Sequence, residues 1–217
     1  MAIDWNIVWV SIPQLVKASV VTIEIALLAG IAEIALGIGL GLMSLARSPW
    51  IRRPVLAYVD IVRGTPLLVQ IFFVYFVLPG FGMDMPPFWA GVAALAFNGA
   101  AFISETVRGA VGAIERGQSE AARSIGMQEG QTLVFVLLPQ ALRQIVPPLT
   151  NEWINLTKNT SLLSAISVFE LTRAGQSLVS IYFAPLEIYT MLALYYYVIV
   201  KVLSLLSRSL ERRLSKW

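Results

Sequence analysis

The chain has 217 residues, of which 57% are hydrophobic and only 13% carry a charged side chain, with a net charge of +3. Soluble domains are about a quarter charged, so this composition excludes an ordinary water-soluble domain and favours an integral membrane protein. Cysteine and histidine are absent. Their absence excludes disulfides, thiolate metal sites and a cysteine nucleophile, and we expect no metal site.

The first residues do not resemble a cleaved signal peptide, because Asp4 stands where a positive charge is expected and the apolar run that follows is too long. Residues 4–17 contain Trp5, Trp9 and Pro13, which favours a short amphipathic helix at the membrane interface. A simple lead-in to the first span is the alternative.

Five regions approach the roughly 20 apolar residues that cross a bilayer. They are residues 18–46, 56–78, 87–107, a segment within 132–166 that prolines and amides interrupt, and 188–206. The sequence therefore predicts an all-α integral membrane protein of about five transmembrane helices, forming a single domain over residues 1–217. Gly37 and Gly41 form a GxxxG pair, which indicates close helix packing within the chain or at a subunit interface.

Basic residues alternate between the two sides of the predicted spans. Short cytoplasmic loops collect Lys and Arg, whereas the loop at residues 79–87 has neither. This pattern predicts an external N-terminus and a cytoplasmic C-terminus. The basic residues follow the first, third and fifth spans: Arg47, Arg52 and Arg53; Arg108, Arg116 and Arg123; Arg208, Arg212, Arg213 and Lys216.

The polar segment 116–130 carries a helical pattern of its own. Residues 118–125 are rich in helix formers, and Gly126 follows where a helix would end in the left-handed conformation. An isolated helix of this length is marginal in water, so it must pack against the spans or a partner protein.

This segment begins the run EAARSIGMQEGQTLVFVLLP, from Glu120 to Pro139. The run resembles the EAA loop of permease subunits in bacterial ABC importers, with Val136 in place of the usual Ile. RGTPLLVQ at 63–70 and NEWINLTKNTSLLSAI at 151–166 resemble the subfamily that imports polar amino acids, the glutamine, arginine and histidine type.

The resemblance implies the type I importer permease fold in a bacterial inner membrane, with 116–130 as a cytoplasmic loop that docks on a dimer of separate ABC ATPases. No GxxxxGK[ST] motif is present, so we expect no enzymatic activity and no cofactor in this chain, with ATP used by the ATPases. The residues expected to couple to the ATPase are Glu120 as a polar contact, Ala121 and Ala122 as a small face, Gly126 as the turn, and Pro139. Further expected partners are a second permease copy, identical or related, an extracytoplasmic solute-binding protein and the lipid bilayer, but no nucleic acid.

Polar side chains at membrane depth usually face a bundle interior or a water-filled path. Two sets each share a helical face and predict a solute path: Asn151, Asn155, Lys158 and Asn159, and separately Asn98 and Glu105. Glu152 is displaced towards a neighbouring face. The alternative is that these groups satisfy one another across the bundle. Glu24 and Glu33 lie on opposite faces and are expected to have private partners or to lie near an interface.

Arg63, Thr65 and Pro66 form a possible gate, because proline interrupts a helix and restricts the residue before it. Equally, Pro66 can simply start a helix. In the permeases that this chain resembles, the position of Asn159 is often acidic, and the neutral amide here favours glutamine or glutamate as the solute.

The competing hypothesis is a stand-alone secondary transporter or channel subunit that uses Glu105, Glu152 and Lys158 as ion relays. Secondary transporters usually show paired repeats, and none is visible here. The EAA loop discriminates between the hypotheses, because only the importer requires it.

Overall fold

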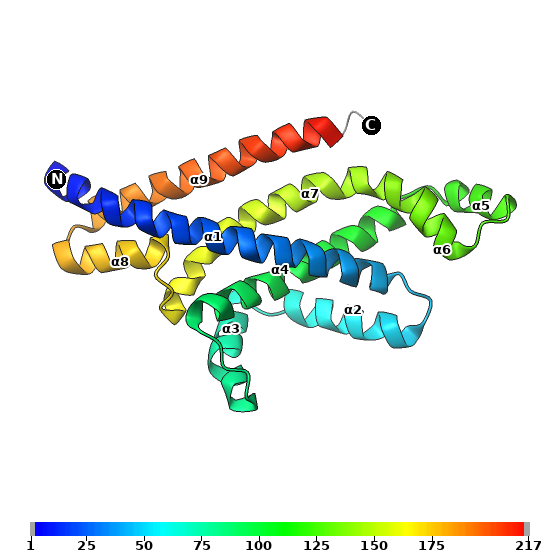
Figure 1. Cartoon of the computed structure of the whole chain (residues 1–217), viewed down its shortest axis with the longest axis horizontal. Coiled ribbons are helices and arrows are strands. Elements are labelled where there is room, and N and C mark those ends of the chain that lie inside the picture. The colour runs from blue at the N-terminus through cyan, green and yellow to red at the C-terminus, as the bar shows by residue number, and fades with distance from the viewer. Residues whose placement is uncertain (1–2, 215–217) are drawn as a thin grey trace.

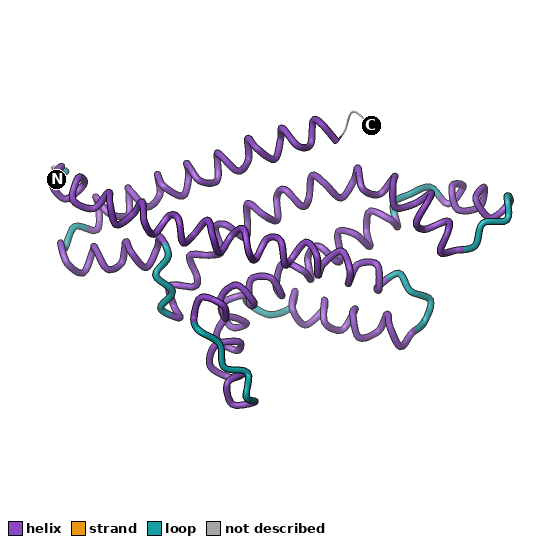
Figure 2. The backbone as a smooth tube through the Cα atoms, viewed as in Figure 1, coloured by secondary structure: helices purple, strands orange, loops and turns teal. Residues whose placement is uncertain are grey.

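The computed structural model describes residues 3–214, which are helical apart from short connections and contain no strand (Figure 2). Four helical segments are long and apolar enough to cross a membrane, and a bent pair of helices is a fifth candidate. The predicted all-α membrane fold with about five spans is confirmed. Of the basic residues assigned to the cytoplasmic side, Lys216 lies outside the described residues.

The first span is one continuous helix, α1 (Trp5–Ser44). The prediction of a separate interfacial helix at residues 4–17 is therefore wrong. The alternative, in which these residues lead directly into the first span, is confirmed. Asp4 caps the helix, since its carboxylate accepts the N–H of Asn6 at 2.9 Å. At about 1.5 Å per residue the helix extends about 60 Å, roughly twice the hydrocarbon thickness.

The second predicted span is broken into α2 (Pro49–Arg63) and the run α3 (Leu67–Phe72), η1 (Phe73–Val77) and η2 (Leu78–Phe81). The two parts are bent by 109°, so a continuous helix over 56–78 is wrong. Pro66 explains the break, because it lacks an N–H and disfavours a helical conformation at Thr65. Pro66 directly precedes α3, as the helix-start alternative predicted.

The third span is α4 (Pro87–Gly112), slightly longer than predicted. Residues 116–130, the predicted coupling segment, contain α5 (Arg116–Ser124), the predicted coupling helix. The fourth span runs from Glu129 to Ile166 as α6 (Glu129–Thr132), η3 (Leu133–Leu137), α7 (Leu138–Asn159) and η4 (Thr160–Ile166).

Two π-helical segments, η1 and η3, precede a Leu-Pro pair. In each, the leucine N–H bonds five residues back, from Leu78 to Phe73 and from Leu138 to Leu133. The proline that follows has no N–H and its ring clashes with the carbonyl four residues earlier, and a wider turn relieves that clash. Pro139 therefore shapes the backbone of its own chain.

The helix α8 (Leu171–Tyr182) was not predicted. It begins at Glu170, whose buried carboxylate accepts the N–H groups of Thr172 at 2.9 Å and Arg173 at 2.8 Å. The last helix, α9 (Pro185–Leu214), starts beside the N-terminus (Figure 1). There the N–H of Asp4 donates to Glu187 at 3.2 Å.

Helices α1 and α4 pack closely through the GxxxG pair. A Cβ added at Gly37 would lie 2.5 Å from Cβ of Ile103, and one at Gly41 would lie 2.6 Å from Cβ of Val107. Packing of this pair within the chain is confirmed, because side chains of α4 occupy the space beside both glycines.

Candidate functional site

Two adjoining cavities collect the polar residues predicted to line a path. A cavity of about 540 Å³ is lined by Asn98, Asn155, Lys158 and Asn159, together with Thr65 at the break between α2 and α3. A second, of about 480 Å³, is lined by Glu105 and Asn151, together with Arg63. Phe102 and Glu152 line both, so the structure brings all six path residues together along one surface. Of the three residues predicted to form a gate, Pro66 lines neither cavity.

Glu152 lies in both cavities, although the sequence interpretation set it on a neighbouring face. At 3.6 residues per turn, Glu152 is only about 20° from Asn159 around the axis of α7. The cavities therefore follow a wider arc of the helix than the four predicted residues do, and the acid beside them belongs to the same surface.

Gln70 of α3, which was not singled out from the sequence, connects the helix break to α4. Its side-chain N–H₂ donates to the carbonyls of Val62 at 2.8 Å and Thr65 at 3.1 Å, and its amide oxygen accepts from Asn98 at 2.9 Å. Gln70 ends the RGTPLLVQ motif, which was the available signal. Because Asn98 is buried and bonded here, part of its role is to hold α3 against α4.

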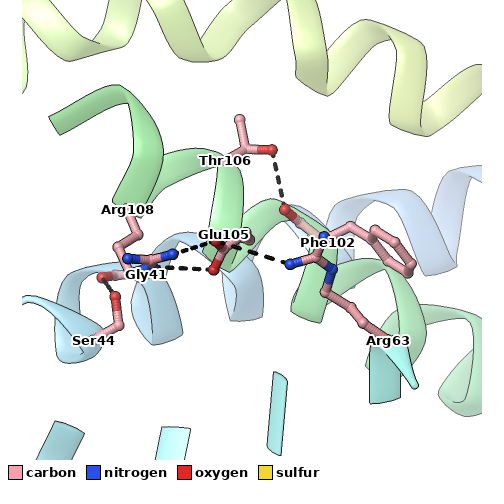
Figure 3. Close-up of polar contacts among 7 residues, drawn as sticks. All are labelled: Gly41, Ser44, Arg63, Phe102, Glu105, Thr106 and Arg108. Atoms are coloured by element: carbon pink, nitrogen blue, oxygen red, sulfur yellow. Dashed lines mark hydrogen bonds and ion pairs between the residues drawn. The ribbon is translucent and has the colours of Figure 1, made fainter. Parts of the chain in front are cut away.

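Glu105 and Arg63, which line the second cavity, form an ion cluster with Arg108 (Figure 3). Glu105 accepts hydrogen bonds from Nε of Arg108 at 3.0 Å and from its Nη2, and Nη1 of Arg63 lies 3.9 Å from Glu105. The guanidinium of Arg63 is also 5.7 Å from the ring centre of Phe102. Glu105 thus ties the end of α2 to α4. This agrees with the alternative in which the polar groups satisfy one another across the bundle.

Glu33 of α1 is 1% exposed, and neither carboxyl oxygen has a hydrogen-bond partner among the described residues. A Cβ added at Gly99 of α4 would overlap the carboxyl group of Glu33, so this carboxyl group fills the space that the glycine leaves. The expectation of a private partner for Glu33 is wrong within the described part of the chain.

The coupling segment has the predicted turn. Gly126 has φ +84°, its N–H bonds to the carbonyl of Arg123 at 2.9 Å, and the N–H of Met127 bonds to Ala122 at 3.1 Å. This is the Schellman arrangement that ends a helix at a left-handed glycine. The predicted left-handed turn at Gly126 is confirmed.

The side chains of the coupling helix point in different directions. Glu120 and Ala121 are exposed, whereas Ala122 is buried against its own chain. Adjacent helical residues are about 100° apart, so the two alanines do not share a face. The predicted small docking face therefore needs a correction, because Ala122 is already covered.

The chain matches the family of binding-protein-dependent transport system inner membrane components over residues 33–216. It belongs to this family. It is 41% identical to the glutamine transport system permease protein GlnP of Escherichia coli (strain K12), covering 99% of both chains. It is 34% identical to the arginine transport system permease protein ArtQ of Bacillus subtilis (strain 168), covering 99% of this permease and 98% of the relative.

Solved structures of ABC transporters superpose on this chain and agree with the family assignment. A crystal structure of an amino acid ABC transporter with histidines superposes with a TM-score of 0.90 at 34% identity, covering 98% of this permease and 100% of that chain. The MetNI methionine ABC transporter, at 21% identity and a TM-score of 0.80, covers 93% of this permease and 96% of that chain and supports the fold alone. The resemblance to importer permeases is confirmed, and the relatives of this chain are permease subunits.

Proposed function

We propose that this permease, paired with an identical or related copy, forms the path of an ATP-driven importer of polar amino acids in a bacterial inner membrane, with glutamine as the favoured solute. The observation that carries the proposal is the convergence of the predicted polar residues on two adjoining cavities, four of them on a single cavity of about 540 Å³. A volume of this size suits a small ligand. The 41% identity to a glutamine permease supports the choice of solute.

The cavity lining is suited to a zwitterion with an amide side chain. Lys158 can donate to an α-carboxylate, and Glu152 can accept from an α-ammonium group. Asn155 and Asn159 offer both donors and acceptors to a side-chain amide. Glutamate is the alternative within the same class.

The permease works with proteins that supply energy and solute. The coupling helix exposes Glu120 and Ala121, and Ile125 at its end is 79% exposed, so an apolar side chain stands free for a partner. We assign this surface to a dimer of ABC ATPases on the cytoplasmic side, where ATP is hydrolysed, and the opposite side to a solute-binding protein. The N-terminus is then external and the C-terminus cytoplasmic. The chain itself carries no catalysis.

The test is reconstitution of the permease in liposomes with its ATPase and binding protein, followed by measurement of ATP hydrolysis. Glutamine-loaded binding protein should stimulate hydrolysis, and Glu120→Arg and Gly126→Pro should abolish the stimulation. Glu115→Arg makes the same charge change at the residue just before α5 and should preserve most of the stimulation. Hydrolysis that no amino-acid-loaded binding protein stimulates would contradict the proposal.

The solute is tested separately through Asn159. Asn159→Asp adds a negative charge to the cavity and should shift uptake from glutamine towards cationic amino acids. Unchanged selectivity would show that this side chain does not contact the solute.

A further inference from the structure

A third cavity, of about 360 Å³, lies away from the candidate path. Its lining comes from the residues just after α1, from the end of α4, from α5 and from the start of the fourth span. Three candidate spans terminate around it, at Ser44, Gly112 and Glu129. The cavity therefore lies at the end of the bundle where these three spans terminate, between the coupling helix and the ends of the spans.

The lining divides into a polar and an apolar part. Arg47, Ser119, Arg123 and Thr132 supply the polar groups, and Leu133 and Leu137 belong to the apolar part. Ser119 and Arg123 are four residues apart, so they share one face of α5, and that face turns towards the spans. The exposed Glu120 is outside this lining, so the cavity is separate from the surface assigned to the ATPase.

Thr132 has an unsatisfied hydroxyl in this lining. Its residue is 3% exposed, and Oγ1 has no hydrogen-bond partner among the described residues. A buried hydroxyl without a partner is unfavourable by about 1–3 kcal/mol. A ligand oxygen in the cavity would remove that penalty by accepting a hydrogen bond from the hydroxyl group.

The charges in the lining favour an anion. Arg47 is paired with Glu129, which also lines the cavity, so these two groups balance each other. Arg123 makes no hydrogen bond or ion pair through its side chain in the described part of the chain. One positive charge is thus left over, and a guanidinium matches the geometry of phosphate oxygens.

We propose that this cavity binds the phosphate group of an anionic phospholipid such as phosphatidylglycerol. Arg123 and Thr132 hold the phosphate oxygens, and an acyl chain follows Leu133 and Leu137 along η3, where Val134 and Phe135 are 52% and 70% exposed. Basic pockets at the ends of transmembrane helices suit anionic headgroups, and the membrane boundary supplies the lipid at high local concentration. A bound lipid would join the coupling helix to the ends of α1 and α4.

The first test measures lipid binding to the purified permease complex in detergent by native mass spectrometry, using dioleoyl-phosphatidylglycerol and dioleoyl-phosphatidylcholine as probes. Arg123→Gln should reduce retention of phosphatidylglycerol about tenfold, since it removes a charge-assisted hydrogen bond. Arg116→Gln removes the same charge from the same helix outside the cavity and should leave retention unchanged. Equal loss or equal retention in the two variants would overturn the site.

The second test uses Thr132→Val, which keeps the shape and removes the hydroxyl. Without lipid, this variant should melt at a higher temperature than the parent, because the unsatisfied group is gone. The increase in melting temperature on adding phosphatidylglycerol should become smaller. An unchanged increase would contradict contact with the phosphate. Full competition by inorganic phosphate at millimolar concentration would overturn the lipid as ligand. These readouts do not depend on which solute the permease carries.

Discussion

The close packing of α1 on α4 offers a direct test of the fold. Gly37 of α1 faces α4, and a Cβ there would lie 2.5 Å from Cβ and 2.6 Å from Cγ2 of Ile103, and 3.1 Å from the carbonyl of Ala100. Gly39, two residues later in the same helix, has no atom within 4 Å of its Cβ position. Gly37→Ala and Gly39→Ala are therefore the same chemical change in two environments.

The expected magnitude follows from the overlap. Ordinary contacts lie at 3.4–4 Å, so the new methyl group overlaps Ile103 by about 1 Å. A β-carbon and a backbone carbonyl cannot rotate away, so α1 and α4 must separate. Overpacking of this kind costs about 1–3 kcal/mol. Replacing a helical glycine by alanine gains roughly 0.5–1 kcal/mol in both variants, which cancels in the comparison.

The assay is the free energy of unfolding in mixed micelles, titrated with a denaturing detergent and followed by tryptophan fluorescence. Gly39→Ala should be as stable as the parent or more stable. Gly37→Ala should be less stable than Gly39→Ala by about 1–3 kcal/mol. Equal stability of the two variants would refute the close packing of α1 on α4 at this point.

Three further predictions concern single residues. Glu33→Met should raise the free energy of unfolding by about 1–3 kcal/mol, since it removes a buried group without partners; a decrease in the same titration would reveal a partner. Gly126→Ala should destabilise the end of α5 by about 1–2 kcal/mol because of its positive φ, seen as faster hydrogen exchange in α5, whereas Gly130→Ala, with open space around it, should not. Glu170→Ala should lower the melting temperature through loss of about 1–2 kcal/mol of capping. Glu170→Gln should recover only part of it, because the two N–H groups bond to different carboxylate oxygens and glutamine keeps one of them.

The sequence determined the features that depend on short stretches of chain. Apolar length predicted the membrane class and located the spans, because the bilayer thickness sets how many residues a helix needs. The left-handed turn at Gly126 was predictable because only glycine adopts that conformation freely. The four-residue spacing of Asn151, Asn155 and Asn159 placed them on one side of α7, since helix geometry is local.

Tertiary structure decided what depends on neighbours distant in sequence. The indole N–H of Trp153 reaches the carbonyl of Ala26, 127 residues away, at 3.0 Å, and sets how α7 lies on α1. Whether Glu152 joins the cavity, whether Glu33 finds a partner, and whether Thr132 is satisfied all depend on which helix covers each side chain. Periodicity assigns a residue to a helical face, but it does not say what that face meets, because burial and pairing arise only when the helices pack together.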